Sequence, residues 1–401
     1  MIINFYSNFL NHHQVLIADA MYSLLGANFH FVATLPRNEK ELKGGEDYSN
    51  RPYCILAGES EEAHKQAALC AESADVCVFG ACSQEFAVIR AKKNPYGLSF
   101  ECGERWLKRG LLNVLSPVLR QWWLNYMRYY RKANFYKLCS SAFAAHDDEL
   151  LSCYKWRHFK WGYFTEVPSE VSGFFDKRSG RAVYKFHASG KSNETLSKIE
   201  ENSGCAIRLM WCARFIDWKH PEMPIRLAMK LKDAGYDFLL DMYGDGMMRP
   251  AMEELSRELN VAEYITFHGN IPNSEIHQAM RDHDIFLFTS DRQEGWGAVA
   301  NEAMSEGCVL VGSDEIGAVP YLVKHKETGM IFRSGDQDSL YEQVKYLLDN
   351  PDVRKQIAKA GRESMVKLWS PANAAKSLLQ LIEDIQAGRE TSIIEGPCSK
   401  A

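Results

Sequence analysis

The sequence predicts an α/β protein composed of two doubly wound domains. Short apolar runs of strand length alternate with helix-forming stretches along the chain, an order typical of parallel sheets that are covered by helices. A length of 401 residues is sufficient for two domains that each bury a hydrophobic core. The third observation is a strand–loop–helix unit in the second half of the chain, which also carries the functional prediction.

The composition indicates a globular protein of the cytoplasm. Hydrophobic residues make up 46% of the chain and charged residues 25%, with a net charge of −5, which are ordinary values for a soluble protein. No apolar run approaches the ~20 residues that span a bilayer, and residues 1–7 predict a first strand instead of a signal peptide. The eleven cysteines include no C-x-x-C pair, so neither a disulfide framework nor a zinc site is indicated.

An N-terminal domain is predicted over residues 1–165. A strand at 2–6, a helix at 15–25 and a second strand at 29–33 begin it, and this order starts a doubly wound sheet. The loop after the first strand contains His13. His13 is a candidate site residue, and the alternative is a solvated loop histidine.

Residues 105–137 form a basic and aromatic stretch. They contain eight Lys or Arg residues and no acidic residue, with tryptophans and tyrosines interleaved. Basic residues beside interfacial aromatics suit an anionic membrane surface, so we predict a peripheral protein on the inner face of the plasma membrane. The alternative is that the aromatic side chains pack internally and the basic ones form a solvated face. Nucleic acid is not expected as a partner, because the chain has no binding-module motif.

The second half of the chain contains a linker and a second domain. A polar region rich in Lys, Ser and Gly predicts a linker over 166–205, followed by a second domain at 206–368. Trp369-Ser-Pro371 predicts a break before a last helix at 369–386, and residues 387–401 are expected to be a flexible tail.

The central functional unit runs from 284 to 307. Ile285 to Phe288 is a continuous apolar run, as expected for a strand buried on both faces of a parallel sheet. Gly295 and Gly297 follow it, and then a helix, so that backbone N–H groups at the helix start favour a phosphate. Glu294 and Glu302 bracket this turn. Each carboxylate can accept hydrogen bonds from a diol, so the pair suits the two sugars of a nucleotide-sugar.

Two cations follow another predicted strand. The apolar run that begins at Ile207 leads to Arg214, and Lys219 comes five residues later. Two cations that converge on a diphosphate can neutralise a departing nucleotide, and arginine adds a bidentate fork.

These two stretches resemble signatures of a known family. The run E-G-W-G-A-V-A-N-E-A-M at 294–304 resembles the E-x7-E signature of retaining glycosyltransferases with the GT-B fold, family 4 or group 1. The run A-R-F-I-D-W-K-H at 213–220 resembles the family's G-R-L-x-x-x-K-G element, with Ala213 and His220 in place of its glycines. The opening S-N-F-L-N-H-H-Q resembles capsular and exopolysaccharide glycosyltransferases.

The resemblance implies a GT-B fold with two Rossmann-like domains that face each other across a cleft, and a last helix that crosses back to the first domain. It implies transfer with retention of configuration, without a metal or other cofactor. The implied catalytic residues are Arg214, Lys219 and Glu294. We predict two further site residues in the first domain, namely Glu104 as a fourth catalytic residue and His13 as a contact to the acceptor or a phosphate of the donor. The implied donor-binding residues are Gly244, Asn270, Ile271, Glu294, Gly295, Trp296, Gly297, Ala298 and Glu302.

One departure concerns a histidine that the family commonly carries at the end of a strand near the reacting sugar. This chain has no histidine there, and Glu101 and Glu104 occupy the neighbourhood. The sequence leaves open which of the two takes its place. The D-x-D pair Asp282 and Asp284 precedes a buried strand, where we expect it to solvate the turn and not to bind a metal.

The function predicted is that of a hexosyltransferase for cell-surface polysaccharide synthesis, with a nucleotide-sugar donor and a saccharide or lipid-linked saccharide acceptor. One alternative is another enzyme on the same fold, such as an epimerase or a phosphorylase. The other is a non-catalytic protein that binds a nucleotide-sugar or forms a complex.

Overall fold

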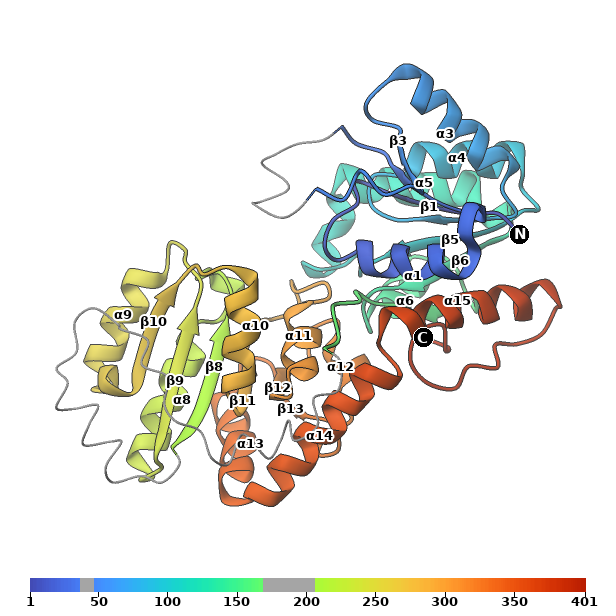
Figure 1. Cartoon of the computed structure of the whole chain (residues 1–401). Helices are drawn as coiled ribbons and strands as arrows, with labels where there is room; N and C mark the ends of the chain where they lie inside the picture. The colour runs from blue at the N-terminus through green and yellow to red at the C-terminus, as the bar shows by residue number, and fades with distance from the viewer. Residues whose placement is uncertain (37–46, 169–205) are drawn as a thin grey trace. The chain divides into compact units, whose positions relative to one another are not determined.

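The structure is a computed structural model, and it describes residues 1–36, 47–168 and 206–401. The chain divides into two compact units, the first comprising Met1–Glu166 with Lys367–Ala401 and the second Val167–Val366. Each unit contains one parallel sheet with helices (Figure 1). The predicted linker at 166–205 lies outside the described residues from 169 onward.

The sheet of unit 1 has the strand order β3-β2-β1-β4-β5-β6-β7. All neighbouring strands are parallel, and the order reverses between β1 and β4. In such sheets ligands bind beyond the carboxyl ends of the strands at this reversal. The strands are β1 (Ile3–Ser7), β2 (Phe29–Ala33), β3 (Cys54–Leu56), β4 (Val76–Phe79), β5 (Leu98–Gly103), β6 (Phe135–Cys139) and β7 (His158–Lys160).

The helices of unit 1 follow the strands, as a doubly wound fold requires. Helix α1 buries Val15, Ile17, Ala18 and Met21, a spacing that places these side chains on one helical face. The α-helices are α1 (Val15–Leu25), α3 (Glu61–Ser73), α4 (Gln84–Lys93), α5 (Pro117–Arg128), α6 (Ala144–Leu150) and α15 (Pro371–Gln386). The 3-10 turns are η1 (Gly26–Asn28), η2 (Gly110–Leu115) and η3 (Tyr130–Lys132).

The prediction of a flexible tail over 387–401 is wrong. Cys398 is fully buried, and its backbone N–H donates to the Lys160 carbonyl at 2.7 Å. The Lys160 N–H in turn donates to the Ser399 carbonyl at 2.8 Å. The tail therefore pairs with β7, whose edge would otherwise present unpaired backbone groups.

The sheet of unit 2 has the order β10-β9-β8-β11-β12-β13, again with parallel neighbours. Its order reverses between β8 and β11, at the two strands that precede Lys219 and Glu294. The strands are β8 (Ile207–Cys212), β9 (Phe238–Tyr243), β10 (Ile265–Gly269), β11 (Ile285–Phe288), β12 (Val309–Ser313) and β13 (Met330–Phe332).

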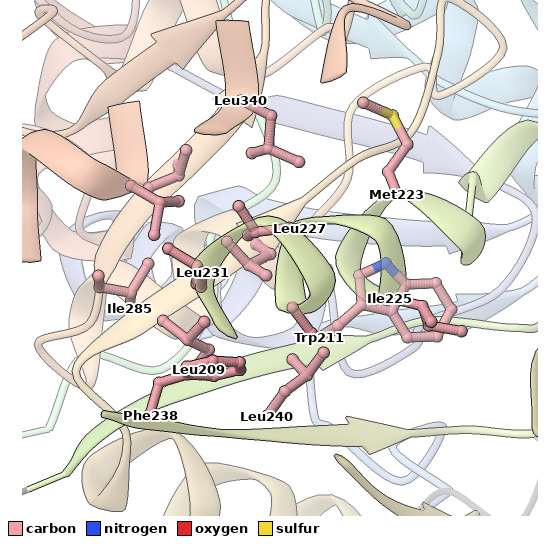
Figure 2. Close-up of a cluster of buried hydrophobic side chains, with 14 of the residues drawn as sticks. Leu209, Trp211, Met223, Ile225, Leu227, Leu231, Phe238, Leu240, Ile285 and Leu340 are labelled. Carbon is pink, nitrogen blue, oxygen red and sulfur yellow. The ribbon is translucent and has the colours of Figure 1, made fainter. Parts of the chain in front are cut away.

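The core of unit 2 lies between the sheet and its helices. Leu209, Trp211 and Leu240 from the strands pack with Leu227 and Leu231 of α8 (Figure 2). Full burial of one such side chain stabilises the fold by about 1.5–3 kcal/mol. The α-helices are α8 (Glu222–Asp233), α9 (Arg249–Glu258), α10 (Asn273–Asp282), α11 (Val299–Ser305), α12 (Val319–Leu322), α13 (Gln337–Asp349) and α14 (Pro351–Lys367). The 3-10 turns are η5 (Asp217–Lys219) and η6 (Ala262–Tyr264).

Candidate functional site

Two loops of unit 2 meet beyond the carboxyl ends of β8 and β11. The Asp291 N–H donates to the Trp218 carbonyl at 3.0 Å. The Thr289 hydroxyl donates to the Lys219 carbonyl at 2.8 Å, and the same hydroxyl accepts from the Trp211 indole N–H at 2.9 Å. These bonds hold the turn that carries Lys219 against the loop that carries Glu294.

Lys219 and Glu294 form an ion pair. Their side chains are only 12% and 13% exposed, so solvent screens the pair weakly. The Ser290 hydroxyl also donates to the same carboxylate oxygen of Glu294, at 3.1 Å. Two of the catalytic residues predicted from the sequence, 75 positions apart, are thus in direct contact.

Arg214 is exposed and lies close to the same turn. Its guanidinium carbon is 6.0 Å from the centre of the Trp218 ring, and the Lys219 ammonium is 4.3 Å from that ring. Both cations therefore flank one aromatic side chain, an arrangement in which each is attracted to the ring. Glu294 is the third catalytic residue predicted for unit 2. It pairs with Lys219 and so completes this group.

Glycine is required at two positions beside this group. Gly297 has a φ of +94°, and a Cβ there would lie 2.4 Å from Cζ of Phe288. Gly244 has a φ of +118°, and a Cβ would lie 2.0 Å from the carbonyl oxygen of Ala213. Any larger residue at either position must displace the chain, because real Cβ contacts are not this short.

The predicted base-binding turn lies at the end of β10. The Gly244 N–H donates to the Gly269 carbonyl at 2.8 Å, which joins the loop after β9 to the turn that carries Asn270 and Ile271. Asn270 is exposed and Ile271 half-buried. Both side chains are therefore accessible, and their contact with a base stays a prediction.

Glu302 lies in α11 and is half-buried. Burial raises the pKa of its carboxyl group, and nearby His277 opposes that shift. Among the described residues no side chain donates a hydrogen bond to this carboxylate, which leaves its oxygens for a ligand. His277, which the sequence analysis did not single out, is 2.9 Å from Oε1 of Glu306.

The Trp296 side chain is not available to a donor, so the predicted donor contact of this residue is limited to its main chain. It is fully buried, and its indole N–H donates to Oδ1 of Asn301 at 2.9 Å. Gly295 is buried as well, whereas Gly297 and Ala298 are half-buried. The large aromatic group fills the core below the loop, so only the main chain of this turn can face a phosphate.

His220 follows Lys219 at the same turn and was not predicted as a site residue. This residue adopts a left-handed backbone conformation with a φ of 49°, at a position where the family carries glycine. Its Nδ1 is 3.1 Å from Oε1 of Glu222 and its Nε2 is 3.5 Å from Oδ2 of Asp291. The hydrogen bond and charge of Glu222, with those of Asp291, raise the pKa of His220. The sequence signals this residue in one way only, since His220 stands where the family's element has a glycine.

Unit 1 contains a cavity of about 460 Å³. It lies beyond the ends of β1, β4 and β5, where the strand order of this sheet reverses. His13 and Glu104 both line it. The structure therefore brings together the two residues of unit 1 that the sequence predicts for the site. We call this cavity the unit 1 pocket.

Tyr163 connects these two residues. Its hydroxyl donates to Oε1 of Glu104 at 2.7 Å, and its ring centre is 5.6 Å from that of His13. Lys108 forms an ion pair with Glu104. Burial, together with the neighbouring His12, lowers the pKa of His13 to about 4, so its imidazole is neutral at neutral pH.

Glu101 does not line the pocket. Its carboxylate accepts from the Tyr154 hydroxyl at 2.5 Å and lies 3.1 Å from the ammonium of Lys137, a residue that is fully buried. Of the two carboxylates that the sequence left open, Glu104 is the one placed beside His13.

The basic and aromatic stretch at 105–137 is only partly a surface. Arg105 and Lys137 are buried and pair with Asp147 and Glu101. These two residues therefore belong neither to the predicted membrane surface nor to a solvated face. The basic residues that remain exposed are Arg109, Arg120, Arg128, Arg131 and Lys132.

Neither a cluster of metal ligands nor a membrane-spanning helix is present within the described ranges. No three His, Cys, Asp or Glu side chains there are grouped so as to hold a metal ion. Asp284 accepts from the Arg208 N–H at 3.1 Å, a contact within the fold. No helix in the same ranges is long and apolar enough to cross a membrane.

The fold identifies the structural class. The structure of Anabaena Alr3699/HepE in complex with UDP is similar, with a TM-score of 0.65 at 14% identity, and the match covers 96% of this chain and 100% of that one. The lipopolysaccharide outer core galactosyltransferase WaaB gives a TM-score of 0.66 at 13% identity, with 96% and 100% covered. The predicted GT-B fold is therefore confirmed.

A family model matches part of the chain. Residues 193–364 match the family model described as glycosyl transferases group 1, which confirms the resemblance for this part of the chain. The 2-deoxystreptamine glucosyltransferase of Streptomyces kanamyceticus is 30% identical over 158 residues, which are 39% of this chain and 40% of that protein. The sulfoquinovosyl transferase SQD2 of Arabidopsis thaliana is 30% identical over 147 residues, 36% and 27% of the two chains. The chain thus matches less than half the length of these two relatives.

Proposed function

We propose that this chain is a retaining hexosyltransferase that uses a nucleotide-sugar donor and a saccharide acceptor, free or lipid-linked, in cell-surface polysaccharide synthesis. The observation that carries the proposal is the contact between Lys219 and Glu294, beside Arg214 and the loop of Gly297. The two cations suit a diphosphate, the carboxylate suits sugar hydroxyls, and all three groups lie at one turn. The names of the two relatives, both of which transfer sugars, support this reading.

In this proposal unit 2 binds the donor. Lys219 and Arg214 stabilise the negative charge that develops on the diphosphate as its bond to the anomeric carbon breaks. Glu294 binds hydroxyls of the donor sugar, Glu302 the ribose, and the main chain at 295–298 a phosphate. No side chain forms a covalent intermediate, so the rate enhancement comes from charge stabilisation and positioning. In this proposal two protein cations neutralise the diphosphate, so the reaction does not need a metal ion.

Unit 1 binds the acceptor in the same proposal. Glu104, held by Tyr163 and Lys108, accepts a hydrogen bond from the acceptor hydroxyl. The oxygen of the acceptor hydroxyl forms the new bond to the anomeric carbon of the donor sugar. The proton of that hydroxyl passes to the departing diphosphate. His13 is neutral in the pocket, so it can exchange a hydrogen bond with the acceptor without adding charge.

Nucleotide binding tests the donor site. We expect UDP, GDP or ADP, or one of their sugar conjugates, to raise the melting temperature of the protein in the presence of EDTA. A ligand at 100 times its dissociation constant adds about 2.7 kcal/mol to the free energy of unfolding if it binds only the folded state. Glu302→Ala should abolish most of this shift, because the ribose loses its acceptor. Absence of a shift with every nucleotide would contradict the proposal.

We further propose that unit 1 binds an anionic membrane surface through the exposed part of residues 109–132. Its five exposed basic residues are interspersed with apolar side chains that also face solvent, namely Leu111, Leu112, Val114, Leu115, Val118, Trp123 and Leu124. Apolar side chains can enter the interface while the basic ones pair with lipid phosphates.

Vesicle co-sedimentation tests this surface. The protein should sediment with anionic vesicles at low salt and remain in solution with neutral ones. Each of Arg120→Glu and Arg128→Glu should weaken binding about fivefold or more, since one basic residue near the surface contributes about 1 kcal/mol. Lys65→Glu, at a 70% exposed side chain of α3, is the matched control and should bind normally. Equal sedimentation with neutral vesicles would contradict the proposal.

A further inference from the structure

One segment is both a wall of the unit 1 pocket and part of the exposed surface. The segment from the 3-10 turn η2 through helix α5 contributes five side chains to the pocket lining, namely Asn113, Ser116, Val118, Leu119 and Trp122. Val118 is 66% exposed although it lines the pocket, so it lies at the rim. Leu119, its neighbour, is 8% exposed and faces inward.

The polar groups of the pocket include two that have no partner. The indole N–H of Trp106 and Nδ1 of His13 are buried and make no hydrogen bond with any described residue. Trp106 as a whole is only 5% exposed. Because an unpaired buried polar group costs free energy, a ligand that supplies hydroxyl groups here would be favoured. Glu104 lines the same pocket and can accept from a further hydroxyl.

Much of the remaining lining is apolar. Ile17, Leu119, Trp161 and Phe164 line the pocket and are each less than a tenth exposed. Outside the rim, Leu111, Leu112 and Leu115 of η2 are between 64% and 76% exposed. Large apolar side chains gathered on one exposed segment mark an interaction site. An apolar path thus leads from the pocket, past Val118, to the surface.

We propose that the unit 1 pocket binds the hydroxyl-bearing head of an amphiphile whose apolar chain leaves the pocket past Val118 and lies over the leucines of η2. This inference rests on the proposed function, in which the unit 1 pocket is the acceptor site, and it decides between a free and a lipid-linked acceptor. Every methylene group of the chain that is covered should strengthen binding about three- to fourfold.

The experiment compares methyl glucoside with octyl glucoside, the latter below its critical micelle concentration, by calorimetric titration of the full chain. We expect octyl glucoside to bind at least 30-fold more tightly than methyl glucoside, since several methylene groups are covered. Val118→Asp should remove most of this difference. Leu69→Asp is the matched control, because Leu69 of α3 is 64% exposed and lies outside the pocket lining.

Two results would overturn the inference. One is a failure of octyl glucoside to bind more tightly than methyl glucoside, whether the two affinities are equal or neither compound binds measurably. The apolar path would then have no role. The other is unchanged affinity for octyl glucoside in Glu104→Gln, because adsorption to the exposed leucines alone does not need the head group. Failure of the proposed function is separable from both: nucleotides would then give no thermal shift while the preference for octyl glucoside remained.

Discussion

Replacement of Lys219 by alanine is expected to lower turnover about 100-fold or more, by analogy with the loss of one donor to a developing oxyanion. Lys219 is the weakly exposed cation in contact with Glu294, so no solvent ion can easily take its place. Arg214→Ala should also lower turnover, because the second cation of the pair is lost. The measurement is the rate of product formation, with the donor that the nucleotide-binding experiment identifies.

A control separates catalysis from stability. Lys345 forms an ion pair with Asp349 on the surface of the same unit, and Lys345→Ala should leave turnover unchanged. Loss of Lys219 also leaves Glu294 without its partner, which costs stability. Thermal unfolding of Lys219→Ala measures this cost separately, and the variant should remain inactive at temperatures at which it is folded. Normal turnover in both Lys219→Ala and Arg214→Ala would refute the assignment of these cations.

Gly297→Ala is expected to abolish the thermal shift by nucleotides and to destabilise unit 2 by about 1–3 kcal/mol. The added methyl group would lie 2.4 Å from Cζ of Phe288 and 2.7 Å from its Cε1. Phe288 is only 2% exposed and belongs to β11, so its ring cannot move away freely. The loop must shift instead, and it carries Glu294 and the main chain assigned to the phosphate.

Gly335 supplies the matched control for this prediction. It has a φ of +70°, but a Cβ there would meet nothing within 4 Å. Gly335→Ala therefore introduces the backbone strain without the collision, and the nucleotide shift should persist. Thermal unfolding with and without nucleotide measures both effects. If Gly297→Ala responds to nucleotide as the unaltered protein does, the loop does not bind the donor.

Local patterns were sufficient to predict the main elements. Helix α1 occupies Val15–Leu25 and strand β11 occupies Ile285–Phe288, the bounds that their residue patterns indicate. A helix with one apolar face and a strand buried on both faces leave periodicities that can be read over a few residues. The two glutamates and Gly297 could be predicted for the same reason, because one strand–loop–helix unit contains them all.

The contact between Lys219 and Glu294 needed more than local pattern. The sequence placed both residues after strands, but only the pairing of β8 with β11 brings their loops together. The resemblance to a known family assigned both residues to one catalytic site but did not predict their contact. The choice between Glu101 and Glu104 had no such support, since the family's histidine is absent from this chain.

The sequence by itself determined the alternation of strands and helices, the signature residues of unit 2 and the positions where the chain departs from its family. The tertiary structure alone decided which side chains face a ligand. Trp296 is buried against Asn301, Glu101 pairs with Lys137, and the tail pairs with β7. Each of these outcomes depends on contacts between residues that their own local sequence does not specify, because side-chain direction and partner are set by packing.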